Sequence, residues 1–317
     1  MRKALVVGID YYENINRLYG CVNDAYAVKN VLERHFDGSP NFGVNALVCS
    51  DVSSRIERRQ LKDLVLELFK DDADIALFYF SGHGYIESTG GYLITSECTD
   101  GDDGFSMDEL LVIANSSKAK NKVVVLDCCH SGIAGNPAVT QEKSFLNEGV
   151  TILTASAKDQ YSIESGGAGV FTTLFVDALN GSAANLVGDI TPGSVYAHID
   201  QSLGPWEQRP IFKTNVKRFI SLREVNPPIA LKELRQITRL FIDPTNILHL
   251  DPSYEPTSDN PDINNIETFA LLQKYNRINL VKPIDEEHMY YAAMNSTGCK
   301  LTVLGSHYWN LVHKDLI

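Results

Sequence analysis

The chain has no apolar run approaching the roughly 18 residues that a membrane-spanning helix needs. Its first residues (2–10, RKALVVGID) turn acidic and polar after a short apolar stretch, without a small-residue cleavage site. They are therefore typical of a first strand and not of a signal peptide. The six cysteines are scattered and show neither a disulfide framework nor a metal-binding spacing. These absences predict a reducing cytoplasmic location and no membrane partner.

An excess of basic charge is also lacking. The formal net charge of the 317 residues is −12, and both the first 225 residues and the remainder are acidic. Nucleic-acid binding depends on basic side chains that neutralise phosphates. We therefore expect no nucleic-acid partner. The apolar fraction of 44% is ordinary for a globular protein with a sizeable core.

Continuous apolar strands alternate with segments of helical spacing in the first two thirds of the chain. Strands are predicted at residues 3–9, 46–48, 75–80, 92–94, 122–126 and 150–155, with residues 216–222 closing the sheet. Helices are predicted at residues 23–36, 107–114 and 171–179. Two more are predicted from their caps: one begins at Asp51 or Ser53 and ends at Phe69, and the other begins at Thr191. The pattern predicts an α/β fold with helices on both faces of a mainly parallel sheet. The alternation of strands and helices ends at the sequence Asn226-Pro227-Pro228. This break predicts a boundary between two domains, 1–225 and 226–317.

Two short strings carry the chemistry. Residues 80–84 (FSGHG) and 126–132 (LDCCHSG) each follow an apolar run and contain a glycine turn. A parallel sheet delivers such residues to the carboxyl ends of its strands. His83 and a cysteine of the second string therefore form a candidate nucleophilic pair.

Strand alternation distinguishes the two adjacent cysteines. Asp127 and Cys129 share one face of the strand, whereas Cys128 shares the other with Leu126. Cys129 is the predicted nucleophile, and Cys128 is predicted to pack as a small apolar side chain. The backbone N–H groups of Gly84 and Cys129 are candidates for an oxyanion hole. The alternative is that both cysteines and His83 are structural core residues; we read His130 as structural.

Residues 79–84 and 127–132 resemble the corresponding strings of the caspase-like superfamily, specifically metacaspases and prokaryotic caspase homologues. Residues 18–25 (LYGCVNDA), 154–160 and 169–172 add to the resemblance, which covers roughly residues 2–222. It implies a caspase-like three-layer sandwich around a parallel six-stranded sheet. It also implies a cysteine endopeptidase with His83 and Cys129 as the catalytic dyad, acting on protein or peptide substrates.

A carboxylate beside the nucleophile favours a cationic substrate side chain, and Asp127 is placed there by strand alternation. The resemblance implies that Asp24, Ser81 and Asp127 line the pocket for the residue before the cleaved bond. Cleavage after Arg or Lys is then expected, and not cleavage after Asp. The alternatives are that Asp24 caps the helix that follows it and that Asp127 holds the Ser131-Gly132 turn.

An acidic loop offers oxygen atoms of the type that calcium prefers. The resemblance implies a possible calcium site there, for which Glu97 and Asp108 are the candidates, although the local sequence departs from the family pattern. The alternative is a solvated acidic loop followed by a helix capped at Ser106. Self-cleavage, another family trait, would fall near Lys143.

The last 92 residues are mainly helical in pattern, apart from a polar loop at about 251–265. Helices are predicted at 286–295, capped by Asp285 and followed by Gly298, and at 303–313, capped by Thr302. Residues 301–312 resemble the last helix of a winged-helix module. Because this part is acidic, we expect it to bind an activator protein and not DNA.

In prokaryotic caspase homologues, accessory domains connect the peptidase to a trigger, often in antiviral defence or programmed cell death. The same role is the expectation from resemblance here. The main alternative is a non-catalytic caspase-like scaffold that binds partners, and a DNA-bound regulator is disfavoured by the charge.

Overall fold

A computed structural model describes residues 1–87, 89–100, 103–128, 146–155, 164–165, 168–204, 209–218 and 220–317. Cys129, His130 and Lys143, which the sequence singled out, lie outside the described residues, as does Asp102 of the acidic loop. The chain divides into two compact units, Met1–Asn226 and Pro227–Ile317. Among the described residues, no helix is both long and apolar enough to span a membrane.

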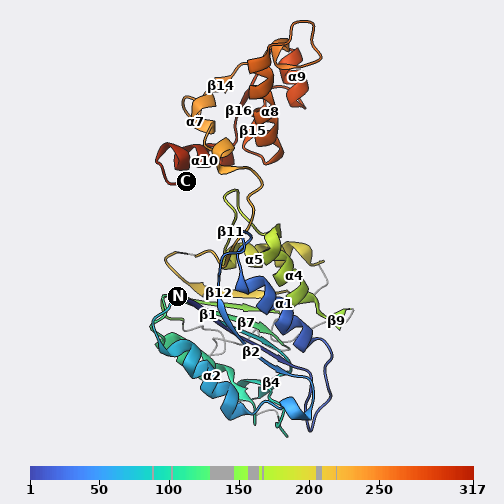
Figure 1. The fold of residues 1–317 in the computed structure, drawn as a ribbon, viewed down its shortest axis with the longest axis vertical. Coiled ribbons are helices and arrows are strands. Elements are labelled where there is room, and N and C mark those ends of the chain that lie inside the picture. Colours follow the sequence, from blue (N-terminus) through green and yellow to red (C-terminus); the bar gives the residue numbers. More distant parts are fainter. Residues whose placement is uncertain are drawn as a thin grey trace. The chain divides into compact units, whose positions relative to one another are not determined.

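The first unit is built on a six-stranded sheet with the order β12-β8-β7-β3-β1-β2. Figure 1 labels β12, β7, β1 and β2 among its strands. The parallel strands are β1 (Arg2–Ile9), β2 (Gly43–Cys49), β3 (Ile75–Ser81), β7 (Asn121–Asp127) and β8 (Val150–Thr154). The edge strand β12 (Ile211–Asn215) is antiparallel to β8. The prediction of a mainly parallel α/β sheet is confirmed.

The predicted closing strand at residues 216–222 is wrong, because residues 211–215 take that place. β12 is only half-buried at Ile211, Phe212 and Lys213 and exposed beyond them, so it lacks the apolar run that marks a central strand. Leu222 is buried because its side chain packs in a hydrophobic core on one face of the sheet, and its N–H donates to the carbonyl of Ile190, 2.7 Å away.

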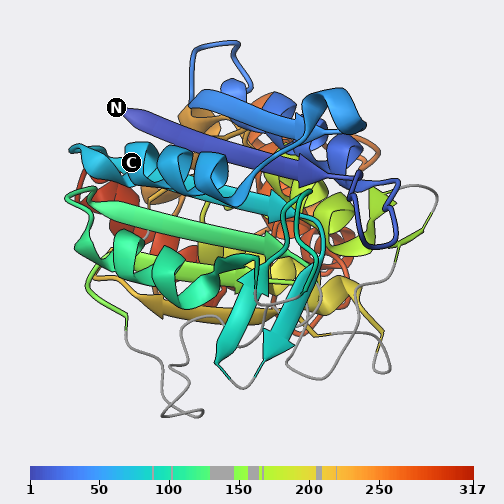
Figure 2. The ribbon, with the colours of Figure 1, turned by 90° about the horizontal axis from the view of Figure 1, so that it is seen from below.

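Helices cover both faces of the sheet (Figure 2). One face packs against α1 (Cys21–Glu33), α4 (Val170–Asp177) and α5 (Pro192–Ser202). The other face packs against α2 (Arg58–Lys70) and α3 (Met107–Ser116). Because side chains alternate along a strand, Leu77 and Val125 enter the first core and Phe78 and Leu126 enter the second.

Two predicted helix caps are confirmed and one is wrong. The side chain of Thr191 accepts from Ser194 N–H in a capping box, and Ser106 accepts from Glu109 N–H. Asp51 instead caps the short 3₁₀ turn η1 (Val52–Ser54), where its carboxylate accepts from neighbouring N–H groups. The helix α2 begins only at Arg58.

Short elements complete the first unit. A three-stranded sheet contains the hairpin β4 (Gly84–Glu87) and β5 (Gly90–Leu93), drawn in teal in Figure 2, together with β6 (Phe105–Ser106). The remaining elements are β9 (Glu164–Ser165), β10 (Ala168–Gly169), η4 (Ala178–Ser182), β11 (Asp189–Ile190) and β13 (Arg223–Glu224). The strand predicted at residues 92–94 overlaps β5, which belongs to this small sheet and not to the six-stranded sheet.

The second unit combines helices with a three-stranded antiparallel sheet. Its elements are α6 (Leu231–Leu234), α7 (Ile237–Leu240), β14 (Ile247–Leu248), η5 (Pro252–Tyr254), α8 (Ile263–Arg277), β15 (Val281–Pro283), α9 (Met289–Met294), β16 (Cys299–Leu301) and α10 (Val303–His313). The sheet was not predicted, because strands of two or three residues leave no periodic pattern. Trp309 is buried, and its indole N–H donates to the carbonyl of Phe241, 2.7 Å away.

The predicted cap at Thr302 is confirmed, since its side chain accepts from Gly305 N–H. The predicted cap at Asp285 is wrong. Asp285 has a φ of 57° in a turn, and α9 begins at Met289 after His288. Gly298 does not follow the helix directly: its φ of 151° lies at the entry to β16, where a Cβ atom would come within 2.7 Å of a backbone carbonyl.

Candidate active site

The carboxyl ends of three neighbouring parallel strands form the floor of the candidate site. Gly8 on β1 is the register partner of Ser81 on β3, which in turn is the partner of Asp127 on β7. Ser81 is two residues after Tyr79, and Asp127 is two residues after Val125, both of which face α1 and α4. The side chains of Ser81 and Asp127 therefore lie on the same face, next to each other.

Asp24 reaches this floor from α1. Its side chain is 3% exposed, and Oδ2 accepts a hydrogen bond from the hydroxyl of Ser81 at 3.2 Å. Both carboxylate oxygens lie 3.3 Å from the backbone N of Gly169, just before α4. Asp24, Ser81 and Asp127, which we call the acidic cluster, are thus brought together from two strands and one helix.

The alternative role for Asp24, capping the following helix, is wrong. The N-cap of α1 is Gly20, and Asp24 already lies within the first turn. The capping carboxylate is that of Asp10, which accepts from the backbone N–H groups of Cys21 at 2.8 Å and Val22 at 3.4 Å. Partial burial raises the pKa of Asp10, and these hydrogen bonds oppose that rise.

The side chain of Asp127 is fixed by a hydrogen bond from α4. It is 6% exposed, and its Oδ2 accepts a 2.6 Å hydrogen bond from the hydroxyl of Thr172 on α4. The same hydroxyl is bonded to the phenol of Tyr79 on β3. A Cβ atom built on Gly169 would come within 2.6 Å of Asp127 Oδ2 and 3.1 Å of Asp24 Oδ2. The two carboxylates therefore approach the same glycine, which leaves room for both.

Cys21 is a residue of this site that the sequence reasoning did not single out. Burial raises the pKa of its thiol well above the ordinary value. A hydrogen bond to Ser81 opposes this rise, while the carboxylates of Asp10, Asp127 and Asp24 add to it. The thiol therefore stays protonated near neutral pH. Its three-residue spacing from Asp24 on a helix is the sequence signal that places the two side by side.

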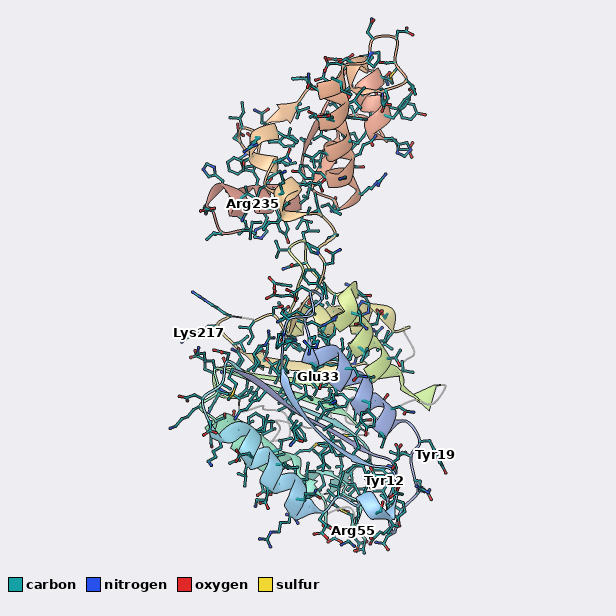
Figure 3. All side chains as sticks on the ribbon, viewed as in Figure 1. Tyr12, Tyr19, Glu33, Arg55, Lys217 and Arg235 are labelled. Carbon is teal, nitrogen blue, oxygen red and sulfur yellow. The ribbon has the colours of Figure 1, made fainter. Side chains whose placement is uncertain are left out.

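His83 follows β3 and is fixed by the loop after β1, on which Figure 3 labels Tyr12 and Tyr19. Its backbone N–H donates to the hydroxyl of Tyr12 at 2.8 Å, and the two rings are 4.7 Å apart. Its Nε2 lies 2.8 Å from the carbonyl oxygen of Asn16. Because a carbonyl only accepts, Nε2 carries a proton and Nδ1 is the nitrogen left to accept one.

The nucleophile proposed from the sequence, Cys129, follows the last described residue of this segment. Its neighbour Cys128 is 1% exposed and packs with Leu126 in the core under α2 and α3, as strand alternation predicts. Gly84, the other candidate for the oxyanion hole, begins β4 directly after His83 and is half-buried.

The described residues do not assemble a calcium site. No three His, Cys, Asp or Glu side chains gather in a metal-binding arrangement within the described part of the chain, which does not include Asp102. Oε1 of Glu97 accepts from the backbone N–H of Arg58 at the start of α2, 2.9 Å away. Partial burial raises the pKa of Asp108. We assign no metal to this loop.

The chain is similar to proteins of one family. The model of the Caspase domain family matches residues 1–220. Curated relatives are named Metacaspase-1: that of Meyerozyma guilliermondii is 28% identical over 46% of this chain and 39% of its own length. That of Candida glabrata is 25% identical over 60% of this chain and 51% of its own. The chain thus spans about half or less of these relatives.

Two solved structures share the fold. A protein of Geobacter sulfurreducens is 17% identical with a TM-score of 0.52, covering 71% of this chain and 100% of that one. Caspase-1 of Spodoptera frugiperda is 14% identical with a TM-score of 0.52, covering 71% of this chain and 91% of that one.

Proposed function

The chain belongs to the caspase-domain family, and from that premise we propose that it is a cysteine endopeptidase that cleaves after Arg or Lys. The observation that carries the proposal is the acidic cluster. Asp24 and Asp127 are both nearly fully buried and both approach Gly169. Ser81 donates to Asp24 and is the register neighbour of Asp127, where β3 and β7 lead into the His83 and Cys129 segments.

In this proposal the sulfur of Cys129 attacks the carbonyl carbon of the substrate while Nδ1 of His83 takes the thiol proton. The carbonyl of Asn16 holds the proton on Nε2 and so keeps the ring in the required tautomer. The N–H groups of Gly84 and Cys129 stabilise the oxyanion. The carbon–nitrogen bond then breaks, and the leaving amine takes the proton from His83.

The second half of the reaction returns the enzyme to its starting state. A water molecule attacks the thioester while His83 accepts a proton from it. The carbon–sulfur bond breaks, the acid product leaves, and the sulfur of Cys129 recovers its proton from His83.

The acidic cluster explains the proposed preference. A guanidinium binds carboxylates through two parallel hydrogen bonds, and an ammonium binds them as a point charge. An aspartate side chain before the cleaved bond would instead meet two like charges in a buried site, which disfavours cleavage after Asp.

We also propose that the second unit binds an activator protein that acts as a trigger, in antiviral defence or programmed cell death, in a reducing cytoplasm. The acidic composition of this part and its compact organisation support a protein partner over DNA or a membrane. The winged-helix resemblance of residues 301–312 remains a prediction. Self-cleavage near Lys143 is a further proposal, which a Lys143→Ala variant that is still cut there would remove.

The test is hydrolysis of fluorogenic peptides ending in Arg, Lys or Asp, with calcium and with a chelator. We expect release after Arg and Lys that disappears in Cys129→Ala and His83→Ala and persists in Cys128→Ala, the matched control. Release after Asp would overturn the role of the acidic cluster. Absence of cleavage under every condition would favour the non-catalytic scaffold.

A further inference from the structure

A small pocket adjoins His83 on the side of the β4–β5 hairpin. Its volume is about 160 Å³, and it is lined by Ile15, His83, Gly84, Tyr85, Ile94, Cys98, Thr99 and Asp100. The pocket shares His83 and Gly84 with the catalytic site but contains no residue of the acidic cluster. It is therefore a second recess beside the same histidine.

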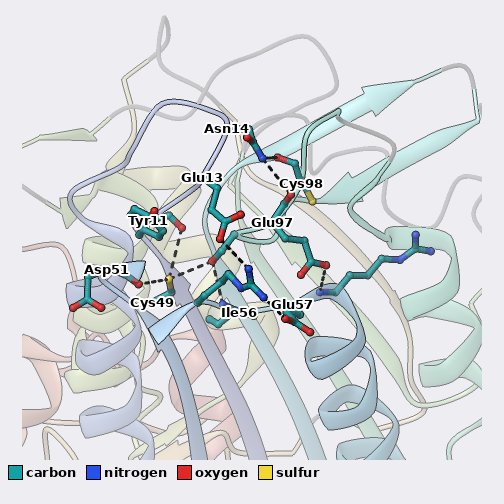
Figure 4. A network of polar contacts seen from close by, with 12 residues as sticks. Tyr11, Glu13, Asn14, Cys49, Asp51, Ile56, Glu57, Glu97 and Cys98 are labelled. Carbon is teal, nitrogen blue, oxygen red and sulfur yellow. Dashed lines mark hydrogen bonds and ion pairs between the residues drawn. The ribbon is translucent and has the colours of Figure 1, made fainter. Parts of the chain in front are cut away.

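Hydrogen bonds join the segments that line the pocket. The side-chain amide of Asn14 donates to the carbonyls of Glu97 and Cys98, at 3.4 and 3.3 Å (Figure 4). The backbone N–H of Ile94 donates to the carbonyl of His83 at 3.0 Å. The segment after β5 is thus bonded both to the loop after β1 and to His83, two residues beyond β3, and these bonds hold the walls of the recess in place.

The interior of the pocket is apolar, and Asp100 is the acidic side chain among its described lining residues. Ile94 and Cys98 are 3% and 2% exposed and form the deep wall, whereas Ile15 and Tyr85 are exposed at the mouth. Burial raises the pKa of the Cys98 thiol, which keeps it neutral. Asp100 is exposed at the rim. A dry apolar cavity of about 150 Å³ accommodates a benzene-sized group, so this recess suits one medium-sized apolar side chain.

The proposed reaction indicates which residue of a substrate would bind in this pocket. The side chain before the cleaved bond enters the acidic cluster, and the leaving amine must pass His83 to take its proton. The residue that carries this amine therefore lies against the other side of the histidine. We propose that the pocket binds the side chain of the residue after the cleaved bond, that it selects Leu-sized apolar side chains, and that Asp100 disfavours acidic ones. This inference rests on the proposed function.

The experiment uses internally quenched peptides that share one sequence through Arg and differ only in the next residue: Gly, Leu, Asn or Asp. A peptidyl-arginine methyl ester, whose leaving group is too small to fill the pocket, tests the dyad and the acidic cluster separately. We expect the Arg–Leu bond to have a kcat/KM about tenfold above that of Arg–Gly, and Arg–Asp to be cut more slowly than Arg–Asn.

Two variants locate the effect. Ile15→Trp narrows the mouth and should bring the Leu:Gly ratio close to one, whereas Val112→Trp, at an exposed apolar residue outside the pocket, should keep it. Asp100→Asn should bring the Asp:Asn ratio close to one. Because each ratio compares two substrates of the same protein, it does not depend on the concentration of active enzyme.

Suppose that the ester is hydrolysed but the kcat/KM ratio of the Leu to the Gly peptide is near one in the unmodified protein, or that Ile15→Trp leaves this ratio unchanged. Either result would overturn the pocket assignment and keep the proposed function. Failure to hydrolyse both the ester and the peptides would overturn the proposed function and this inference with it.

Discussion

The hydroxyl of Thr172 lies 2.6 Å from Oδ2 of Asp127, and both side chains are buried. Because a carboxylate only accepts, the single proton of Thr172 is committed to Asp127. The phenol of Tyr79, which is bonded to the same hydroxyl, must then donate its own proton to Thr172. This directed chain from β3 through α4 to β7 holds the Asp127 carboxylate in one position in the acidic cluster.

Replacing Thr172 by Val removes the hydroxyl at nearly constant shape. We expect a loss of about 1–3 kcal/mol in the free energy of unfolding, because Asp127 and Tyr79 each lose a buried partner. We also expect a larger KM for arginine peptides with a smaller change in kcat. Thr172→Ser keeps the hydroxyl and should restore KM. Urea denaturation and steady-state kinetics measure both effects, and a Val variant with the original KM would contradict the positioning role.

Gly169 makes room for the two carboxylates. Its φ of −67° suits any residue, so the expected effect of Gly169→Ala is steric and local. The new Cβ would lie 2.6 Å from Asp127 Oδ2, and the carboxylate must shift. We expect kcat/KM for arginine peptides to fall at least tenfold while circular dichroism stays native. Full activity in a folded Gly169→Ala protein would show that the cluster does not bind the substrate.

Tyr12 supports His83 through its hydroxyl, which accepts from the histidine N–H at 2.8 Å. Tyr12→Phe keeps the ring contact and leaves that N–H without this acceptor, at a cost of about 1–3 kcal/mol. We expect kcat to fall more than KM rises, since the base is displaced and the acidic cluster is not. Equal effects on kcat from Tyr12→Phe and from Tyr290→Phe, at an exposed tyrosine of the second unit, would argue against this supporting role of Tyr12.

Thiol reactivity provides a test that needs no substrate. The side chains of five cysteines are at most 5% exposed: Cys21, Cys49, Cys98, Cys128 and Cys299. Burial raises the pKa of Cys299 to about 12 and also raises the pKa of Cys21 and Cys98, so little thiolate forms at neutral pH. We expect iodoacetamide to modify Cys129 alone in the native protein and all six cysteines after denaturation. Peptide mass spectrometry identifies the modified cysteines. If another cysteine of the native protein reacted before Cys129, the assignment of Cys129 as the reactive thiol would be contradicted.

The sequence predicted the central sheet because most of its strands are apolar throughout, and alternation placed Asp127 on the face of the predicted nucleophile Cys129. Ser81 and Asp24 were placed with Asp127 only through the family resemblance, since nothing local says which strand end a helix of the first β–α unit will face. Tyr12, Asn16 and Thr172 were missed for the same reason: their partners are set by tertiary packing. The strand β12 and the small sheet of the second unit were missed because short or half-buried strands carry little periodicity.

The most direct test of the account compares two peptides that differ only at the residue before the cleaved bond, arginine in one and its neutral isostere citrulline in the other. Binding to buried carboxylates should give arginine roughly a hundredfold advantage in kcat/KM. The isosteric variants Asp24→Asn and Asp127→Asn should each reduce that ratio at least tenfold. The control variant Asp63→Asn, at an exposed residue of α2, should leave it unchanged. An arginine-to-citrulline ratio that survives both substitutions would contradict the claim that the acidic cluster recognises the substrate's positive charge.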